Sequence, residues 1–338
     1  MINLCFGLII FNFLLFINLK KLAKFVNIFD KPDRKLKLHK VKTPIVGGFI
    51  FALNFFIIFF YQIFFLKNFL SLDVKIFHDL ELFSLLILIF AYFFLGLYDD
   101  KYKLNPLKRL ILSILIVLLA IFLNENLLIT NLSLSFYKHK IFLNNLSIVF
   151  TIFCILILTN SLNFYDGING QSCFIFIYFF TYLLFKSDFN LFYLTCIVLL
   201  LIVMLQNLKN MLFLGDGGVY LMSIILSISL IYEHNIHKSI VFADEIFFLL
   251  LLPGLDLLRL TISRSLNKNN PLLGDRQHIH HLFINKFSLL FSNILLLLMS
   301  ILPLFLFTLL NLNFFIVFFA FLIIYIFSIQ YFKSGIKS

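Results

Sequence analysis

The stretch Leu82–Asp100, LFSLLILIFAYFFLGLYDD, decides the fold, because seventeen residues without a charge lead directly into two adjacent aspartates. An apolar run of this length is sufficient to cross a hydrocarbon layer of ~30 Å as a helix. The run is continuous rather than alternating, and backbone amides cannot stay unpaired in lipid, so a helix is favoured over a barrel strand. Similar runs recur along all 338 residues, 62% of which are hydrophobic, with a mean hydropathy of +1.05. The sequence therefore predicts an all-α, polytopic membrane bundle.

Hydrophobic windows divide the chain into eleven predicted spans, which form one transmembrane domain over residues 1–338. The spans are 3–19, 44–66, 80–98, 106–123, 146–162, 171–185, 190–206, 217–232, 244–262, 288–309 and 313–332. The first span lacks a basic leader and a cleavage pattern, so we expect it to remain as a helix. The loops are too short for a separate soluble domain, and no internal repeat indicates inverted halves.

Lys and Arg are distributed unevenly between alternate loops. Of the 27 basic residues, 21 fall in segments 20–43, 99–109, 207–216, 259–287 and after residue 332. By the positive-inside rule these segments face the cytoplasm, so the N-terminus is predicted outside a plasma (inner) membrane. The net charge of +11 lies in short loops beside apolar spans. We therefore expect membrane lipid and phosphorylated substrates as partners, and no nucleic acid.

Four polar clusters occur where predicted spans end, and they hold five of only 16 acidic residues. They are Gly96-Leu-Tyr-Asp99-Asp100, Asn160-Ser-Leu-Asn163-Phe-Tyr-Asp166-Gly167, Phe213-Leu-Gly-Asp216-Gly217 and Asp275-Arg-Gln-His278-Ile-His280-His281. All four fall on the predicted cytoplasmic side, which was assigned from Lys and Arg alone. A carboxylate at the bilayer centre costs ~2.5–3.5 kcal/mol, so avoidance of lipid explains the depth of the aspartates but not their grouping. We expect one active site at this membrane surface.

Asp99 and Asp100 end a span that runs inward, so they are predicted at a helix C-terminus. The macrodipole disfavours carboxylates there, so a cationic group should compensate them, and Lys101, Lys103, Lys108 and Arg109 could do so as plain surface pairs. Adjacent helical residues point about 100° apart. We therefore expect different roles, with one aspartate at the reacting centre and the other orienting it or a neighbouring helix.

Asp166 and Asp216 are predicted at the start of outward-running spans. Free amides and the positive end of the helix dipole favour anions at such a position. The glycine after each aspartate allows the backbone to approach a phosphate or a base closely. Asn163 precedes one motif, and the ring of Phe213 in the other is suited to stacking on a nucleobase.

The loop 263–287 combines cationic and imidazole side chains. Neither Cys nor a helical i, i+4 His pair accompanies the imidazoles, so a structural zinc site is disfavoured. Cations and imidazoles packed together are typical of a diphosphate-binding loop. The residues concerned are Arg264, His278, His280 and His281.

Three groups outside these clusters also carry predictions. Lys40, just before Thr43-Pro44-Ile-Val-Gly47-Gly48, is a candidate phosphate contact. Asp256 lies inside a predicted span, where we expect it to pair with Arg259 as structural support. Glu233 is expected to be a solvated loop group on the far side of the membrane.

Carboxylates and Asn at helix ends make a hard oxygen site. Such a site suits Mg²⁺ or Mn²⁺, with substrate phosphates completing the coordination shell. The metal would stabilise charge on a leaving diphosphate. The residues therefore indicate phosphoryl transfer at a membrane face.

In order and spacing, these motifs resemble those of the polyprenyl-phosphate N-acetylhexosamine-1-phosphate transferases, glycosyltransferase family 4, over about residues 30–285. Thr43 to Gly48 resembles the Pro-x-x-Gly-Gly motif, and Gly96 to Asp100 resembles the Asp-Asp motif. Asn160 to Gly170 and Phe213 to Asp216 resemble the Asn-x-x-Asn-x-x-Asp-Gly and Phe-Leu-Gly-Asp motifs. The run from Asp275 to His281 is similar to that of the undecaprenyl-phosphate N-acetylglucosamine-1-phosphate branch.

The resemblance implies an enzyme of ten or eleven spans that moves a sugar 1-phosphate from a UDP-sugar to polyprenyl (undecaprenyl) phosphate and releases UMP. It implies Asp99, Asp100 and Asp166 as catalytic residues, Asp216, Asn163 and Asp99 as magnesium ligands, and Lys40, Asn169, Phe213, Arg264, His278, His280 and His281 as substrate contacts. Of these residues, Asp166, Asn169 and Phe213 would line the uridine pocket. Asp99 would deprotonate the lipid phosphate and Asp100 would orient it. A covalent aspartyl phosphate stays open as an alternative.

The donor and the pathway also stay open. The product would be the first lipid-linked intermediate of an envelope polysaccharide or O-antigen-type glycan, whereas a phospho-N-acetylmuramoyl-pentapeptide transferase would serve peptidoglycan. An ion-coupled transporter is the alternative from another class, and it predicts carboxylates near mid-bilayer. A homodimer is neither required nor excluded.

Overall fold

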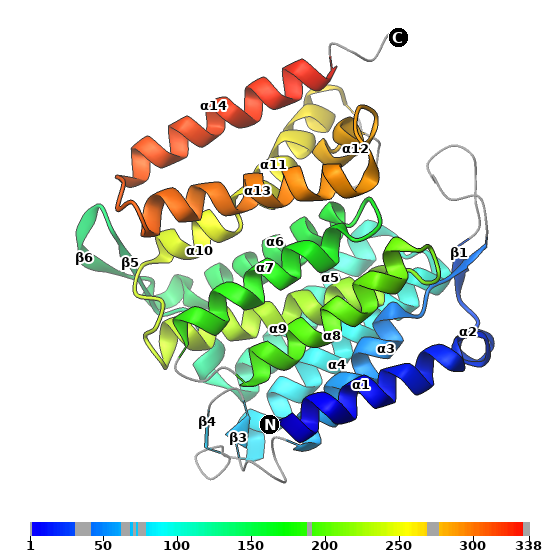
Figure 1. Cartoon of the computed structure of the whole chain (residues 1–338). Coiled ribbons are helices and arrows are strands. Elements are labelled where there is room, and N and C mark those ends of the chain that lie inside the picture. Colours follow the sequence, from blue (N-terminus) through cyan, green and yellow to red (C-terminus); the bar gives the residue numbers. More distant parts are fainter. Residues whose placement is uncertain are drawn as a thin grey trace.

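The computed structural model of the chain describes residues 2–30, 42–61, 68–69, 72–73, 79–187, 191–268 and 277–333. These ranges contain fourteen α-helices and three two-stranded antiparallel sheets (Figure 1). The helices are α1 (Ile2–Ile17), α2 (Leu19–Val26), α3 (Gly47–Tyr61), α4 (Asp79–Tyr102), α5 (Pro106–Leu123), α6 (Ser147–Tyr165), α7 (Gln171–Lys186), α8 (Leu191–Leu208), α9 (Gly215–Asn235), α10 (Ala243–Leu249), α11 (Leu251–Leu266), α12 (Ile279–Ile284), α13 (Leu289–Thr308) and α14 (Phe314–Lys333). The strands are β1 (Phe29–Asp30), β2 (Thr43–Pro44), β3 (Asn68–Phe69), β4 (Leu72–Asp73), β5 (Asn131–Leu134) and β6 (Tyr137–Phe142). The predicted all-α class is confirmed.

Each predicted span coincides with a helix or a bent helix pair. Among the described residues, six helices are long and apolar enough to cross a membrane. Two bent pairs, α1 with α2 and α10 with α11, bring this number to eight. Helices α3, α7 and α8 are apolar but shorter. The helical membrane bundle is thus confirmed, and the count of eleven spans stays a prediction.

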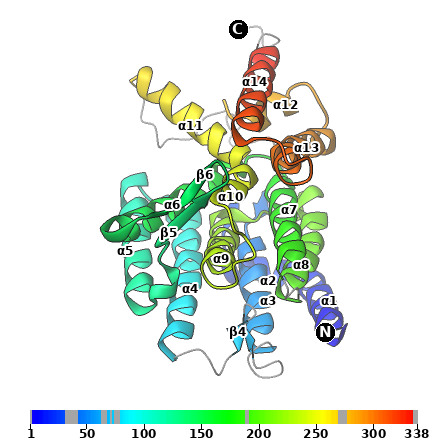
Figure 2. The ribbon, with the colours of Figure 1, turned by 90° about the vertical axis from the view of Figure 1, so that its left-hand side faces the viewer.

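Helix α9 lies in the middle of the bundle (Figure 2). Of its apolar window 89% is buried, against 22% for α5 and for α14. It packs most extensively against α4, and also against α3 and α6. The motif that opens α9 is therefore surrounded by the ends of three other helices.

Helices α11 to α14 lie together on one side of the bundle formed by α1 to α9 (Figures 1 and 2). Helix α13 packs against α7 and α10, and α14 packs against α13. Helices α10 and α11 meet at a bend of 68°. This bend directs α11 and the short helix α12 toward the end of the bundle that carries the aspartates.

Two local predictions from the sequence were wrong. The segment 20–43 was expected to be a basic loop, yet it begins with helix α2, which buries Leu19 and Ala23 and exposes its lysines. Eight residues are too few for a clear helical period in the sequence. Glu233 is not solvated but buried, where it accepts hydrogen bonds from Tyr193 Oη at 2.8 Å and Ser239 Oγ at 2.6 Å.

Candidate active site

Glycines allow three helices to touch at the end of the bundle that carries the aspartates. A Cβ added to Gly48 of α3 would lie 2.4 Å from the backbone nitrogen of Gly218 in α9. A Cβ added to Gly96 of α4 would lie 2.5 Å from the carbonyl oxygen of Asp216. Backbone meets backbone at both contacts, so only glycine fits. Three motifs that are far apart in the sequence therefore meet at one point.

Asp100 caps helix α9 from the neighbouring helix α4. Its Oδ1 accepts the backbone N–H of Asp216 and its Oδ2 accepts that of Gly217, each at 3.0 Å. These first-turn amides have no acceptor within their own helix, and a negative charge is favoured at this end of the dipole. Asp100 as a whole is only 8% exposed. Asp100 therefore orients α9 and the Asp216 side chain, in agreement with the expectation that one aspartate of the pair orients a neighbouring helix.

Asp99 is compensated by a cation, as the sequence predicted. Its Oδ2 lies 2.8 Å from the Arg109 guanidinium, and its Oδ1 accepts the backbone N–H of Leu104 at 2.7 Å. Arg109 belongs to the first turns of α5, which starts directly after the turn that ends α4. The side chain of Asp99 is thus held by the loop and the helix that follow it.

Asp216 lies between Asp99 and Asn163. Its Oδ1 accepts the side-chain amide of Asn163 at 2.9 Å, and its carboxylate approaches that of Asp99 within hydrogen-bonding range. Two carboxylates so close repel each other unless a proton or a cation lies between them. Together with the amide oxygen of Asn163 they form a hard oxygen set, which fits Mg²⁺ or Mn²⁺. The structure thus brings together all three predicted metal ligands.

Asp166 lies at the C-terminal end of α6, not at the start of a helix as the sequence analysis expected. A turn separates it from α7, which begins at Gln171. The hydroxyl of Ser172 donates to Asp166 Oδ1 at 2.6 Å. Burial raises the pKa of Asp166 to about 6; the Ser172 bond lowers it and the nearby Asp216 charge raises it. Ser172 was not among the predicted residues, because a lone Ser in an apolar helix gives no signal.

Thermal unfolding of the metal-free protein is expected to depend on pH through Asp166. Its pKa of about 6 in the folded state lies above its ordinary value of 3.8, so between these values only the folded chain holds the proton. Stability should therefore fall as pH rises through about 6. In detergent with a chelator, the melting temperature of Asp166→Asn should fall less between about pH 4 and pH 7 than that of the wild type. The exposed-site variant Glu125→Gln should keep the wild-type slope, and an unchanged slope in Asp166→Asn would contradict the prediction.

The histidine run is attached to α11 through Asp256. Asp256 pairs with Arg259 at 2.8 Å, as predicted, and its Oδ2 lies 2.8 Å from His278 Nδ1. Its Oδ1 accepts the hydroxyl of Tyr325 at 2.9 Å, and the backbone N–H of Ile279 also points to it, at 3.2 Å. Asp256 therefore fixes the orientation of the His278 ring. Tyr325 belongs to α14 and was missed, because no sequence pattern links it to a residue sixty-nine positions earlier.

Two of the histidines pack against the Asp166 motif. The ring of His278 stacks on Phe164 with centroids 5.8 Å apart, and the Arg264 guanidinium lies 5.9 Å from the same Phe164 ring. His280 lies against Gly167, where a Cβ would be only 1.7 Å from its Nε2. Burial lowers the pKa of His280 well below its usual range, and the neighbouring His281 and His278 lower it further. His280 is therefore a neutral imidazole at pH 7.

The side chains of Asp256, His278 and His280 place one ligand atom each within 4.8 Å of one another, a spacing that a metal ion could use. Both oxygens of Asp256 already accept bonds from other groups, including the Arg259 guanidinium. A second guanidinium, that of Arg264, lies 3.4 Å from His278 Nε2. The guanidinium groups of Arg259 and Arg264 already supply two positive charges here and would repel a further cation, so we assign the group to ion pairing.

The predicted uridine contacts Asn169 and Phe213 occupy two different places. The side chain of Asn169 donates to Asn210 Oδ1 at 2.6 Å, and its carbonyl oxygen accepts from Asn293 at 2.8 Å. Phe213 forms an isolated parallel bridge with Ile45. Asn169 thus connects the turn before α7 to the turn after α8. Phe213 connects the segment before α9 to the segment before α3.

Lys40 and Asp275 lie outside the described residues. The predicted site residues that are described all occur at the same end of the bundle. Asp99, Asp100, Asn163 and Asp216 form one connected group, and Asp256 joins His278 to Arg259 in a second. His281 is half-buried beside His280, with ring centroids 4.3 Å apart. The roles assigned to these residues stay predictions.

Residues 82–250 match the model of a class of membrane enzymes that transfer a sugar 1-phosphate onto a polyprenyl phosphate. This class is glycosyl transferase family 4, and because the match spans half of the chain, the chain belongs to that family. The matched region contains the three aspartate-bearing helix ends, those of α4, α6 and α9, but stops before Asp256 and the histidine run. No curated protein matches the chain.

Proposed function

We propose that the chain transfers N-acetylhexosamine 1-phosphate, with N-acetylglucosamine as the sugar, from a UDP-sugar to polyprenyl (undecaprenyl) phosphate, with release of UMP. The observation that carries this proposal is the grouping of Asp99, Asp216 and Asn163 at one end of the bundle. That end would face the cytoplasm, with the N-terminus outside the plasma (inner) membrane. The product would begin an envelope polysaccharide.

The oxygens of Asp216, Asp99 and Asn163 would hold Mg²⁺ or Mn²⁺. A bound metal would supply positive charge to the diphosphate of the donor. Asp100 contributes indirectly, because its two bonds to the first amides of α9 fix the position of Asp216. Arg109 similarly keeps Asp99 in place.

In the proposed reaction an oxygen of the lipid phosphate attacks the sugar-linked phosphorus of the donor. A new phosphorus–oxygen bond forms, and the bond from that phosphorus to the bridging oxygen breaks, so the electron pair leaves with UMP. A phosphate monoester has a second pKa of about 6 and is mostly dianionic at pH 7. Asp99 would accept the proton from the remaining monoanion.

The remaining predicted residues would hold the donor. Arg264 and His278 lie beside Phe164 and would contact the phosphates. His280 is neutral and would act only as a hydrogen-bond donor or acceptor. We further propose His281 and Lys40 as phosphate or sugar contacts, and Asn169, Phe213 and Asp166 as the lining of the uridine pocket.

The test of the function is release of UMP from UDP-N-acetylglucosamine by the purified protein. Turnover should require both polyprenyl phosphate and Mg²⁺. A panel of UDP-sugars, including UDP-N-acetylmuramoyl-pentapeptide, would identify the donor in the same assay. If no UDP-N-acetylhexosamine supports turnover by folded protein, the proposal is wrong.

Tyr325→Phe is expected to lower kcat/KM about tenfold in this assay. The variant removes a hydroxyl that donates to Asp256 and accepts from Arg259 Nε at 2.9 Å. A hydrogen bond to a charged group contributes roughly 1.5–3 kcal/mol, and its loss would allow the His278 ring to move. Tyr331→Phe, at an exposed position of the same helix, is the matched control and should behave as wild type. Full activity of Tyr325→Phe would show that the network does not support catalysis.

A further inference from the structure

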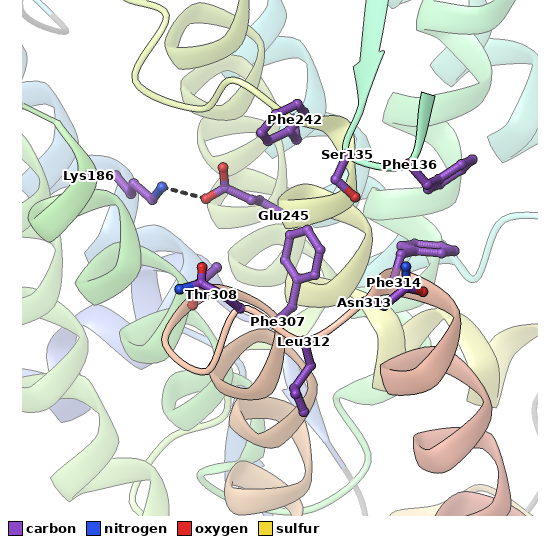
Figure 3. A pocket seen from close by; sticks show the side chains of 11 residues that line it. Ser135, Phe136, Lys186, Phe242, Glu245, Phe307, Thr308, Leu312, Asn313 and Phe314 are labelled. Atoms are coloured by element: carbon purple, nitrogen blue, oxygen red, sulfur yellow. Dashed lines mark ion pairs between the residues drawn. The ribbon is translucent and has the colours of Figure 1, made fainter. Parts of the chain in front are cut away.

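A pocket of about 410 Å³ opens at the end of the bundle opposite the aspartates (Figure 3). Helix α7 begins five residues after Asp166 and ends at Lys186 on the pocket wall. Sixteen helical residues span roughly 22 Å, so the pocket lies well away from the candidate active site. Its other walls are the tip of the β5–β6 hairpin, α10 and the turn between α13 and α14.

An ion pair between Lys186 and Glu245 forms the polar side of the pocket. Lys186 Nζ lies 2.5 Å from Glu245 Oε2, which also accepts the hydroxyl of Tyr182 at 2.7 Å. Both bonds use the same oxygen, and among the described residues no hydrogen bond reaches Oε1. The ammonium has three donors and its side chain is 34% exposed. The pocket therefore offers a carboxylate oxygen as acceptor and ammonium hydrogens as donors, side by side.

Four aromatic rings line the pocket beside Leu312 and the polar side chains of Ser135, Thr308, Asn311 and Asn313. Phe242 and Phe307 lie on either side of Glu245 in Figure 3, and Phe136 faces Phe314 with ring centroids 5.0 Å apart. Rings placed beside a carboxylate favour an organic cation, because the ring faces are negative. The chemistry of the walls thus fits a group that carries both charges, with its cation at Glu245 and its anion at Lys186.

At the turn between α13 and α14, the rim of the pocket carries exposed apolar residues next to the exposed Asn311 and Asn313 of the pocket lining. Leu309, Leu310 and Phe315 are 69%, 53% and 49% exposed. They lie where two candidate membrane spans, α13 and α14, meet, and most of the surface of both helices is unburied. A ligand that leaves the pocket across this rim would pass directly onto a lipid-facing surface. The occupant should therefore be an amphiphile.

We propose that this pocket binds the headgroup of a phospholipid that carries a primary ammonium and a phosphate, as phosphatidylethanolamine does. The ammonium would donate to Glu245 Oε1 between the aromatic rings, and the phosphate would accept from Lys186. The volume lies in the range of ~300–1,000 Å³ typical of small-molecule sites. The acyl chains would lie along α13 and α14. This site uses none of the residues of the proposed transferase reaction.

The absence of Trp from the chain makes a direct test simple. Phe136→Trp places a single indole in the pocket wall. The control is Phe122→Trp, which places the indole outside the pocket, at an 86% exposed position near the C-terminal end of α5. Both variants are reconstituted in phosphatidylcholine vesicles that contain an equal small fraction of brominated ethanolamine, choline or glycerol phospholipid. The brominated ethanolamine lipid should quench the indole at position 136 more than the other two. The indole at position 122 should be quenched equally by all three.

Two further variants, made in the Phe136→Trp background, test the polar contacts. Lys186→Gln and Glu245→Gln should each lower the relative affinity for the ethanolamine lipid about tenfold, the effect of one hydrogen bond to a charged group. Lys186 is partly exposed, so its replacement tests the idea even if Glu245→Gln fails to fold. Equal quenching of the indole at position 136 by all three lipids would overturn the proposal. So would a preference for the glycerol lipid, or an ethanolamine preference that survives both variants.

Discussion

Asp216→Asn is expected to lower UMP release by about a thousandfold or more, the largest effect of any single substitution considered. The variant keeps the shape of the side chain and an oxygen that can accept from Asn163, but it removes one negative charge from the proposed metal site. It also leaves the bonds from Asp100 to the backbone of α9 intact. The measurement is turnover with UDP-N-acetylglucosamine, polyprenyl phosphate and Mg²⁺ in excess.

The matched control for Asp216→Asn is Glu125→Gln, which removes a carboxylate charge at an exposed position. It should retain full turnover. The melting temperature of Asp216→Asn should stay at or above that of the metal-free wild type, because the variant relieves the repulsion with Asp99. Activity within tenfold of wild type would remove Asp216 from the reaction.

Gly96→Ala is expected to destabilise the protein by about 1–3 kcal/mol and to reduce activity severely. The new methyl would meet the carbonyl oxygen of Asp216 at 2.5 Å, so α4 and α9 would have to separate. Both bonds from Asp100 to α9 would lengthen as a result. The effect is read as a lower melting temperature in detergent together with a lower rate of UMP release.

Gly254→Ala is the control for this prediction. Gly254 lies within helix α11, and nothing lies within 4 Å of an added Cβ. Replacement of a helical Gly by Ala without a clash should be neutral or stabilising by up to about 1 kcal/mol. If Gly96→Ala and Gly254→Ala melt alike, the close contact between α4 and α9 does not limit stability.

The sequence was sufficient to predict which segments form membrane helices and which helix ends carry the grouped aspartates. The uncharged run before Asp99 and the scarcity of acidic residues make both features visible without coordinates. The partners of these residues were harder to predict. Asp100 caps amides 116 and 117 positions away, and no local pattern indicates which helix end an aspartate will meet.

The surroundings of individual side chains could not be predicted from the sequence either. Glu233 lies at the end of a helix, which is where solvated groups usually occur, but Tyr193 and Ser239 enclose it. Asp166 is the first residue after α6. Whether its carboxylate meets the negative C-terminal end of one helix or the positive N-terminal end of the next therefore depends on where α6 ends. An error of three residues in that boundary reversed the prediction.

The burial of α9 also has a consequence for biosynthesis. Among the six long apolar helices α9 has the lowest mean hydropathy, 1.4, although it is the most enclosed. It carries Ser223, Ser227 and Glu233, which gain little from contact with lipid. Helices α3, α4 and α6, which surround it, are all synthesised earlier. A circularly permuted chain that began with α9 would present this span to the translocon alone, and insertion of that span would fail more often than in the natural order.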